Sequence, residues 1–293
     1  MNFVTLKDLI ADARKKHYAI PAFDVSNYEM IRCVSEVCEE EKSPAILMCL
    51  QPELEGKGLG FMVDIAKHAA SEYNVPFCLH LDHATEMKNI VRAVEAGFSS
   101  VMYDGSRLSF SENATNTKEV VDYAHAHGLT VEAELGHVAD AIAGNNQSLV
   151  SSSTEAEIEE NFTKPADVVE FVARTNVDCL AVAIGTAHGV YVKAPKLNLE
   201  LLDRINTVSP IPLVLHGGSG TPDSEIRGAI AGGITKINVY SEVLNALNTG
   251  LLNKLSSIHN MSMWPCFVYE EAIKKMKDVI RDKIRIFGSN GKA

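Results

Sequence analysis

Eight short apolar runs rich in β-forming residues recur along the chain and alternate with longer segments of helical periodicity. The runs are YAIPAF, AILMCL, PFCLHL, SSVMYD, LTVEAE, CLAVAI, PLVLHG and TKINVY. Strands that alternate with helices in this way form βαβ units around a parallel sheet. Eight units in about 250 residues predict an α/β fold, the TIM (β/α)8 barrel. An open doubly wound sheet is the alternative, but it requires a glycine-rich fingerprint after the first strand, and AFDVSN has none.

The segments between the runs predict helices. Three of them end in a glycine, at Gly97, Gly128 and Gly232, where a helix commonly needs a left-handed residue. By number, the predicted helices are 28–41, 62–73, 86–96, 117–127, 165–175, 199–208 and 223–231.

Two segments interrupt this alternation. Residues 136–162 are polar and rich in Gly, Ser and Asn, so we expect a long mobile loop near 136–162 over the active face. Residues near 265–293 predict a C-terminal helical extension with apolar residues at helical spacing. Residues 1–293 are therefore expected to form a single barrel domain.

Charge and composition exclude several classes of partner. The formal charge of −11 and the pI near 5.4 argue against nucleic acid and anionic membranes, which are bound through clustered Lys and Arg. The N-terminal segment lacks a signal-peptide core, and no stretch reaches the roughly 18 apolar residues of a membrane span. We expect a cytoplasmic protein. Six cysteines without a CxxC pair predict neither disulfides nor a cysteine metal cluster.

Three of the ten histidines follow predicted strands, at the end where barrel enzymes place catalytic groups. His83 follows CLHLD, His188 follows LAVAIGTA, and His216 ends PLVLH. Three imidazoles that converge from three strands match a zinc site with an open position for substrate, and another divalent ion fits the same ligands. The alternative is that these are three unrelated polar residues at strand ends.

Acidic residues end the same predicted strands. Asp82 precedes His83, and we interpret it as a general acid or base rather than a ligand. Asp104 and Glu134 end the fourth and fifth strands, and they are candidates to orient the histidines or to serve as alternative metal ligands. The sequence assigns no role to His137, at the start of the predicted loop.

The segments after the seventh and eighth predicted strands indicate a phosphate site. HGGSG, residues 216–220, forms a glycine-rich turn, and NVYS, residues 238–241, ends the eighth strand before another helix. Loops after strands seven and eight are the usual phosphate site of such barrels, where backbone N–H groups and a helix N-terminus bind the anion. A metal close to a phosphate anchor indicates a reaction that polarises a carbonyl and stabilises a carbanion.

Motifs across nearly the whole chain carry a family resemblance: LDH, AGFSSVMYDGS, ENATNTKEVVDYAHAHGLTVEAELG, VDCLAVAIGTAHGVY, IPLVLHGGSG, KINVYSE and FGSNGKA. They resemble the class II, metal-dependent fructose/tagatose-bisphosphate aldolase family. The resemblance implies an aldehyde-lyase that cleaves or forms a ketose phosphate through the enediolate of dihydroxyacetone phosphate. It also implies a zinc ion or another divalent metal, is compatible with a monovalent cation, and favours a homodimer or homotetramer.

The resemblance also assigns residues by position. The implied zinc ligands are His83, His188 and His216, and Asp82 corresponds to the proton donor for the aldehyde oxygen, which removes the C4 hydroxyl proton during cleavage. The residues implied for the dihydroxyacetone phosphate site are Gly189, Gly217, Ser219, Asn238 and Ser241.

The chain departs from the family pattern at positions that matter for the choice of substrate. Asp24 replaces the usual asparagine, Leu50 the usual serine, and Tyr240 a residue that is commonly small or acidic. Before the last helix, IHNMSMWP lacks the DPR arginine that binds a distal phosphate in bisphosphate aldolases. We therefore predict a ketose 1-phosphate, or another sugar phosphate without a second phosphate, as the substrate.

Two further assignments and three alternative functions stay open. The loop lacks the family's G-x-E-D glutamate, which moves the carbon-bound proton, and Asp140 and Glu155 are candidate replacements. Arg107 is either a ligand for an acidic substrate terminus or a solvated surface residue. The alternatives are a fructose/tagatose-bisphosphate aldolase proper, which acts on a ketose 1,6-bisphosphate, a zinc hydrolase on the same barrel, and a noncatalytic sugar-phosphate binder.

Overall fold

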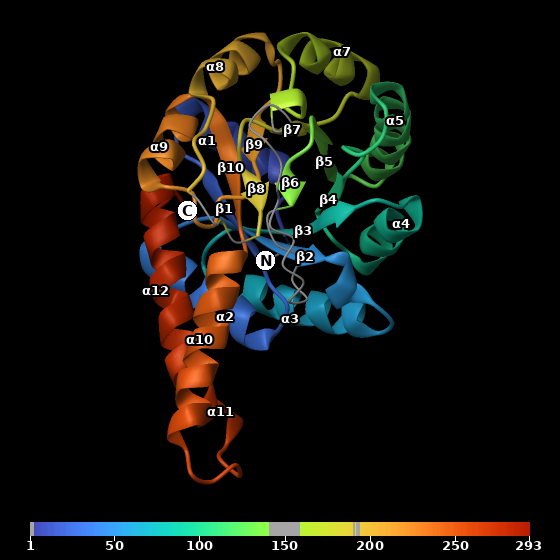
Figure 1. The fold of residues 1–293 in the computed structure, drawn as a ribbon. Coiled ribbons are helices and arrows are strands. Elements are labelled where there is room, and N and C mark those ends of the chain that lie inside the picture. Colours follow the sequence, from blue (N-terminus) through green and yellow to red (C-terminus); the bar gives the residue numbers. More distant parts are fainter. Residues whose placement is uncertain (1–2, 141–158, 190, 192–193) are drawn as a thin grey trace.

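Eight parallel strands close into a barrel in the order β1-β10-β9-β7-β5-β4-β3-β2 (Figure 1). The computed structural model describes residues 3–140, 159–189, 191 and 194–293. The predicted TIM (β/α)8 barrel is confirmed. The barrel strands are β1 (Ile20–Asp24), β2 (Ala45–Leu50), β3 (Phe77–Ala84), β4 (Ser100–Tyr103), β5 (Thr130–Leu135), β7 (Cys179–Val182), β9 (Leu213–Leu215) and β10 (Ile234–Val239).

Helices cover the outside of the barrel (Figure 1). Four of the predicted helices have the predicted bounds, namely α2, α7, α8 and α9. The helices are α1 (Leu6–Lys16), α2 (Tyr28–Glu41), α3 (Gly58–Glu72), α4 (Met87–Ala96), α5 (Phe110–Ala126), α7 (Pro165–Thr175), α8 (Leu199–Val208), α9 (Asp223–Ala231), α10 (Ser241–Ser257), α11 (Pro265–Val268) and α12 (Glu270–Phe287), with a short 3-10 turn, η1 (Gln51–Leu54). In the described residues, no helix has the length and apolar character that a membrane crossing requires.

The other three predicted helices, α3, α4 and α5, have bounds that differ from the prediction. Helix α5 begins at Phe110 rather than 117, because Ser109 caps it: the Ser109 hydroxyl accepts from the backbone N–H of Glu112, whose side chain accepts from the N–H of Ser109. Gly97 and Gly128 are left-handed as predicted, with φ of 98° and 79°. The prediction for Gly232 is wrong by one residue, since its φ is −78° and Gly233 has a φ of 106°.

Successive side chains along each strand point alternately outward and into the barrel, so the strands contribute to two separate apolar clusters. In β3, Phe77, Leu79 and Leu81 pack beneath the helices, whereas Cys78 points into the barrel and contacts the cluster built on α1. Helix α1 contributes Leu6, Leu9, Ile10 and Ala13 to this inner cluster and so closes the N-terminal end of the barrel. The opposite end, where the strands finish, carries the polar residues.

A small second sheet lies at that end. Strands β6 (Ala139–Asp140) and β8 (Ala187–His188) form a separate two-stranded parallel sheet. Residues 141–158, most of the predicted mobile loop, lie outside the described residues. Within the described part of the chain no two cysteines form a disulfide, and five of the six cysteines are buried.

Helices α10 and α12 pack side by side and extend away from the barrel, with α11 at their far end (Figure 1). Their backbones approach closely at Gly250, where an added Cβ would lie 2.4 Å from Cα of Ala272. Only glycine therefore fits at this crossing without a shift of one helix.

We expect Gly250→Ala to lower the free energy of unfolding by about 1–3 kcal/mol, because the added methyl group forces α10 away from α12. Gly60→Ala in α3 is the matched control, since nothing lies within 4 Å of the position of its Cβ. Removing backbone freedom from the unfolded chain should make that variant more stable by about 0.4–1 kcal/mol. Urea denaturation of both variants measures the difference, and equal stabilities would contradict this account of the crossing.

Candidate active site

Asp82 and His83 both face the site although they are neighbours on one strand. Alternation alone would send them to opposite faces of β3. The register between β3 and β4 shifts between Leu81 and Ala84, and His83 has a φ of 48°, which is rare for a residue with a side chain. This bulge turns both side chains toward the mouth of the barrel. Backbone strain of this kind is typical of functional positions.

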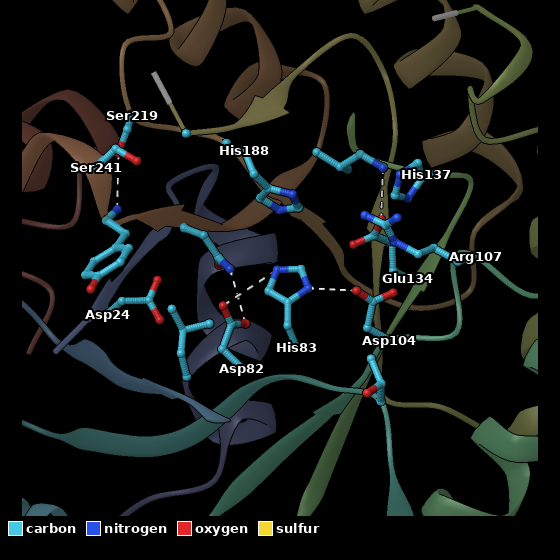
Figure 2. Close-up of a pocket in the computed structure, with 17 residues that line it drawn as sticks. Asp24, Asp82, His83, Asp104, Arg107, Glu134, His137, His188, Ser219 and Ser241 are labelled. Atoms are coloured by element: carbon cyan, nitrogen blue, oxygen red, sulfur yellow. Dashed lines mark hydrogen bonds and ion pairs between the residues drawn. The ribbon is translucent and has the colours of Figure 1, made fainter. Parts of the chain in front are cut away.

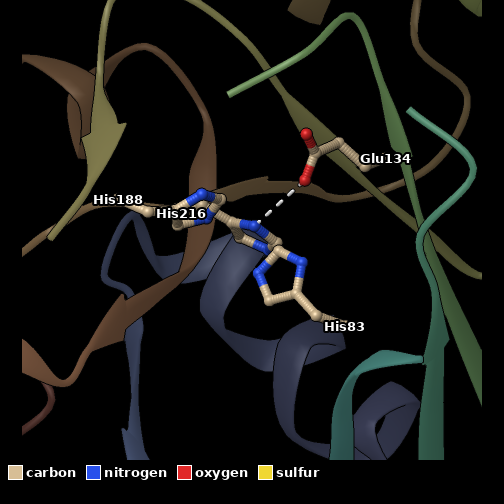
Figure 3. Close-up of side chains that lie close together, drawn as sticks. All are labelled: His83, Glu134, His188 and His216. Atoms are coloured by element: carbon tan, nitrogen blue, oxygen red, sulfur yellow. Dashed lines mark ion pairs between the residues drawn. The ribbon is translucent and has the colours of Figure 1, made fainter. Parts of the chain in front are cut away.

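Three imidazoles and one carboxylate converge at the mouth of the barrel (Figure 3). The ring centroid of His83 lies 4.7 Å from that of His188 and 4.8 Å from that of His216. The ring centroids of His188 and His216 are 5.5 Å apart. Glu134 joins them, and one potential ligand atom from each of the four residues lies within 4.8 Å of the others. The sequence assigned Glu134 as an orienting residue or alternative ligand; the structure places it within the ligand cluster.

The donor set fits a divalent cation. Nδ1 of His216 and Oε2 of Glu134 are buried, lie 3.3 Å apart, and have no hydrogen bond of good geometry within the described part of the chain. Imidazole nitrogens with one carboxylate oxygen are the ligands that zinc prefers in catalytic sites. His83, Glu134, His188 and His216 would therefore hold the ion.

Asp104 fixes the orientation of His83. The Oδ2 atom of Asp104 lies 2.9 Å from Nδ1 of His83, and Figure 2 shows this contact. Burial opposes the charged form of Asp104, but the hydrogen bond and charge of His83 hold the pKa of this carboxyl well below its usual range. An ionised carboxylate only accepts, so His83 donates from Nδ1 and leaves Nε2 for a ligand.

Asp82 lies beside the cluster as a buried carboxylate. Burial opposes its charged form, but His83 and the more distant Lys236 outweigh this and lower the pKa of Asp82. Its Oδ1 accepts from the side-chain amide of Asn238 at 3.4 Å, and its Oδ2 is 3.7 Å from Nε2 of His83. Asp82 is therefore ionised, oriented and ready to accept a proton.

The histidine cluster and the glycine-rich turn share one cavity of about 360 Å³. Apart from the two candidate loop acids, all the predicted site residues except His216 line it, and His216 joins them through the ligand cluster. The lining residues among those predictions are Asp82, His83, Asp104, Glu134, His188, Gly189, Gly217, Ser219, Asn238 and Ser241. The predicted site residues are thus brought together, with the ends of six different strand segments contributing.

The turn after β9 is held in one conformation. Gly217 has a φ of 68°, and a Cβ there would lie 2.4 Å from the carbonyl oxygen of Ala187. The hydroxyl of Tyr191 donates to the carbonyl oxygen of Gly217 at 2.9 Å and accepts from the N–H of Ala187 at 2.8 Å. Ser219 accepts from the N–H of Tyr240 at 3.1 Å, which ties the turn to the start of α10. This turn and the N-terminus of α10 form a rigid end of the cavity.

Further lining residues bear on the substrate. Asp24, Leu50 and Tyr240, the three departures from the family pattern, all line the cavity, and Asp24 is 5% exposed. Arg107 and His137 lie on the side opposite Asp24 (Figure 2). The sequence left His137 without a role, because a histidine at the root of a loop gives no strand-end signal. Its Nδ1 lies 3.1 Å from the hydroxyl of Ser106.

Comparison with known proteins agrees with this geometry. A family model described as fructose-bisphosphate aldolase class-II matches residues 4–292. The chain belongs to the class II fructose-bisphosphate aldolase family. The resemblance seen in the motifs is therefore confirmed.

Solved structures of family members have the same fold. The YdjI aldolase from Escherichia coli K12 is 35% identical, with a TM-score of 0.85 and 100% of both chains covered. A candidate fructose-1,6-biphosphate aldolase from Coccidioides immitis is 30% identical, with a TM-score of 0.84 and coverage of 98% of this chain and 97% of that one. The fructose-bisphosphate aldolase of Campylobacter jejuni, at 22% identity and a TM-score of 0.81, covers 100% of this chain and 97% of its own and supports the fold alone.

We expect Asp104→Ala to weaken zinc binding by about 10–100-fold, because His83 loses the partner that fixes its orientation. Competition with a chromophoric chelator measures the affinity. Asp122→Ala is the control, since this acid is exposed on α5 and contacts Lys118. If Asp104→Ala bound zinc as tightly as the parent protein, Asp104 would not orient the ligand.

Proposed function

We propose that the protein is a class II aldolase that reversibly cleaves a ketose 1-phosphate to dihydroxyacetone phosphate and an aldehyde. The observation that carries the proposal is a single cavity lined by His83, His188 and Glu134 of the ligand cluster, by the ionised Asp82 and by a rigid glycine-rich turn. These are a cation site, a base and an anion site within reach of one small molecule. Membership of the aldolase family supports the same reaction.

Each part has a chemical task in this proposal. A bound divalent cation would polarise the C2 carbonyl and stabilise the charge that develops there. Asp82 accepts the C4 hydroxyl proton, the C3–C4 bond breaks, and C4 leaves as the aldehyde while the electron pair stays with C3. Protonation at C3 completes dihydroxyacetone phosphate. Glu155, one candidate for that proton transfer, lies outside the described residues, and Asp140 is described only as part of β6.

The phosphate group of the substrate is assigned to the rigid turn. Gly217, Ser219 and Ser241 line that end of the cavity, and α10 begins at Ser241. The positive end of the helix dipole of α10 favours a dianion at this position. Gly189 lines the same cavity, and the side-chain amide of Asn238 donates to Asp82.

A single phosphate fits the charge of the cavity better than two. Arg107 is the only Lys or Arg among the described lining residues, whereas Asp24 places a carboxylate on the opposite wall and Leu50 offers no donor. A second phosphate near Asp24 would meet like charge. The second candidate is a fructose/tagatose-bisphosphate aldolase proper, favoured by the 30% identical protein whose description names fructose-1,6-biphosphate.

Several broader properties belong to the same proposal. We place the enzyme in the cytoplasm, with zinc as its metal and a homodimer or homotetramer as its assembly. Residues 1–293 would form one barrel domain. The family assignment supports each of these, and a metal analysis and a sedimentation measurement would check the metal and the assembly.

Purified, zinc-loaded protein should release dihydroxyacetone phosphate from at least one ketose 1-phosphate in a panel that also contains ketose bisphosphates and acidic sugar phosphates. A coupled assay detects the product. Asp82→Ala should reduce kcat by about 10²–10⁴-fold through loss of the base, and chelation should abolish turnover. No turnover on any substrate by a folded, zinc-containing protein would favour the hydrolase or the noncatalytic binder instead.

Asp24→Asn should shift specificity toward bisphosphates. Replacing the carboxylate with a neutral amide removes the repulsion, so kcat/KM for a ketose 1,6-bisphosphate should rise about tenfold relative to the 1-phosphate, equivalent to roughly 1.4 kcal/mol. Asp203→Asn, an exposed acid on α8, controls for net charge. A parent enzyme that already prefers the bisphosphate would refute this view of Asp24.

A further inference from the structure

A buried ion pair lies inside the barrel beneath the histidine cluster. Glu132 on β5 and Lys236 on β10 are both 0% exposed, and Nζ of Lys236 lies 2.8 Å from Oε2 of Glu132. The other carboxylate oxygen, Oε1, lies 2.9 Å from Nε2 of His216, which is also fully buried. The three side chains therefore form a continuous chain of contacts from the barrel interior to the metal cluster.

The charges of Lys236 and Glu132 determine which nitrogen of His216 is available to a ligand. The ammonium of Lys236 lies 2.8 Å from Oε2 of Glu132 with both side chains fully buried, so Glu132 is the carboxylate of an ion pair. An ionised carboxylate only accepts hydrogen bonds. His216 must then donate from Nε2, which leaves the lone pair of a neutral ring on Nδ1, the atom 3.3 Å from Oε2 of Glu134.

We propose that Glu132 and Lys236 are positioning residues of the metal site: Glu132 turns Nδ1 of His216 toward the cation, and Lys236 supplies the charge that keeps Glu132 in place. This inference rests on the proposed metal-dependent function. His83 presents Nε2 because Asp104 binds its Nδ1, so two acids select opposite nitrogens on two histidines.

Lys236 is needed because a lone carboxylate is not stable at this depth. An uncompensated buried charge is strongly unfavourable, whereas a paired and hydrogen-bonded one is tolerated. In the described residues the other contacts of Glu132 are weak: the thiol of Cys179 is 3.8 Å away and Nε2 of His80 is 3.9 Å away. Without the ammonium, Glu132 would lack a strong partner for Oε2 and would not keep its orientation toward His216.

The test compares two double variants that both remove the buried charges. Glu132→Gln with Lys236→Met keeps a side-chain carbonyl that accepts from Nε2 of His216, whereas Glu132→Met with Lys236→Met has no acceptor. Zinc affinity is measured by chelator competition, and the absorption spectrum of the cobalt-loaded protein reports the ligand geometry. Affinity is preferred to turnover, because Lys236 also stabilises the charge of Asp82.

We expect the Gln/Met variant to bind zinc within about threefold of the parent protein. The Met/Met variant should bind about 10–100-fold more weakly and give an altered cobalt spectrum, because His216 is no longer oriented. The single variant Lys236→Met should weaken binding similarly if it folds. Lys277→Met, which removes a Lys–Glu pair between α12 and α2 outside the barrel, is the control and should bind zinc normally.

Equal zinc affinities of the two double variants would overturn the role of Glu132, and a folded Lys236→Met with parental affinity would overturn that of Lys236. The double variants carry no unpaired buried charge, so they decide the question even if the single variant does not fold. A parent protein that binds no zinc would instead refute the proposed function itself.

Discussion

Closure of eight parallel strands is the constraint on which the site depends. Strands β3 and β9 are not neighbours in the barrel, yet the rings of His83 and His216 approach to 4.8 Å because both strands end at the same narrow mouth. Backbone hydrogen bonds around the whole ring fix these distances before any ligand binds. The site is therefore preorganised by secondary structure rather than by loops.

The barrel interior changes from apolar to charged along its axis. Side chains of α1 and the lower strand residues close one end with an apolar cluster. Above it lies the Lys236–Glu132 pair, and above that the histidines and Asp82. Burying these charges is unfavourable unless each is paired, and here each member contacts the next. The folded state thus retains charges whose main benefit is the orientation of the groups at the mouth.

Much of this arrangement was readable from the sequence. Apolar runs gave the strands, and the strand-end rule selected His83, His188 and His216 from ten histidines. The Lys236–Glu132 pair was not predicted, because in TKINVY and LTVEAE a polar residue at every second position looks the same whether it faces solvent or the barrel interior. The bulge at His83 was equally invisible, since it depends on the register between β3 and β4. Local pattern fixes periodicity, but the face and the register are set by the whole barrel.

The net charge of the chain bears on how the protein attracts its substrate. A protein of net charge −11 does not attract a sugar phosphate by its overall field, so the attraction must arise locally. In the proposed function, the N-terminus of α10 and a cation held by the histidines would supply it. Asp24 and Asp82 line the same cavity, and Asp82 must remain ionised to accept a proton. A second phosphate would have to overcome both acids with Arg107 as its one described cationic partner, which is why the geometry favours a substrate that is charged at one end.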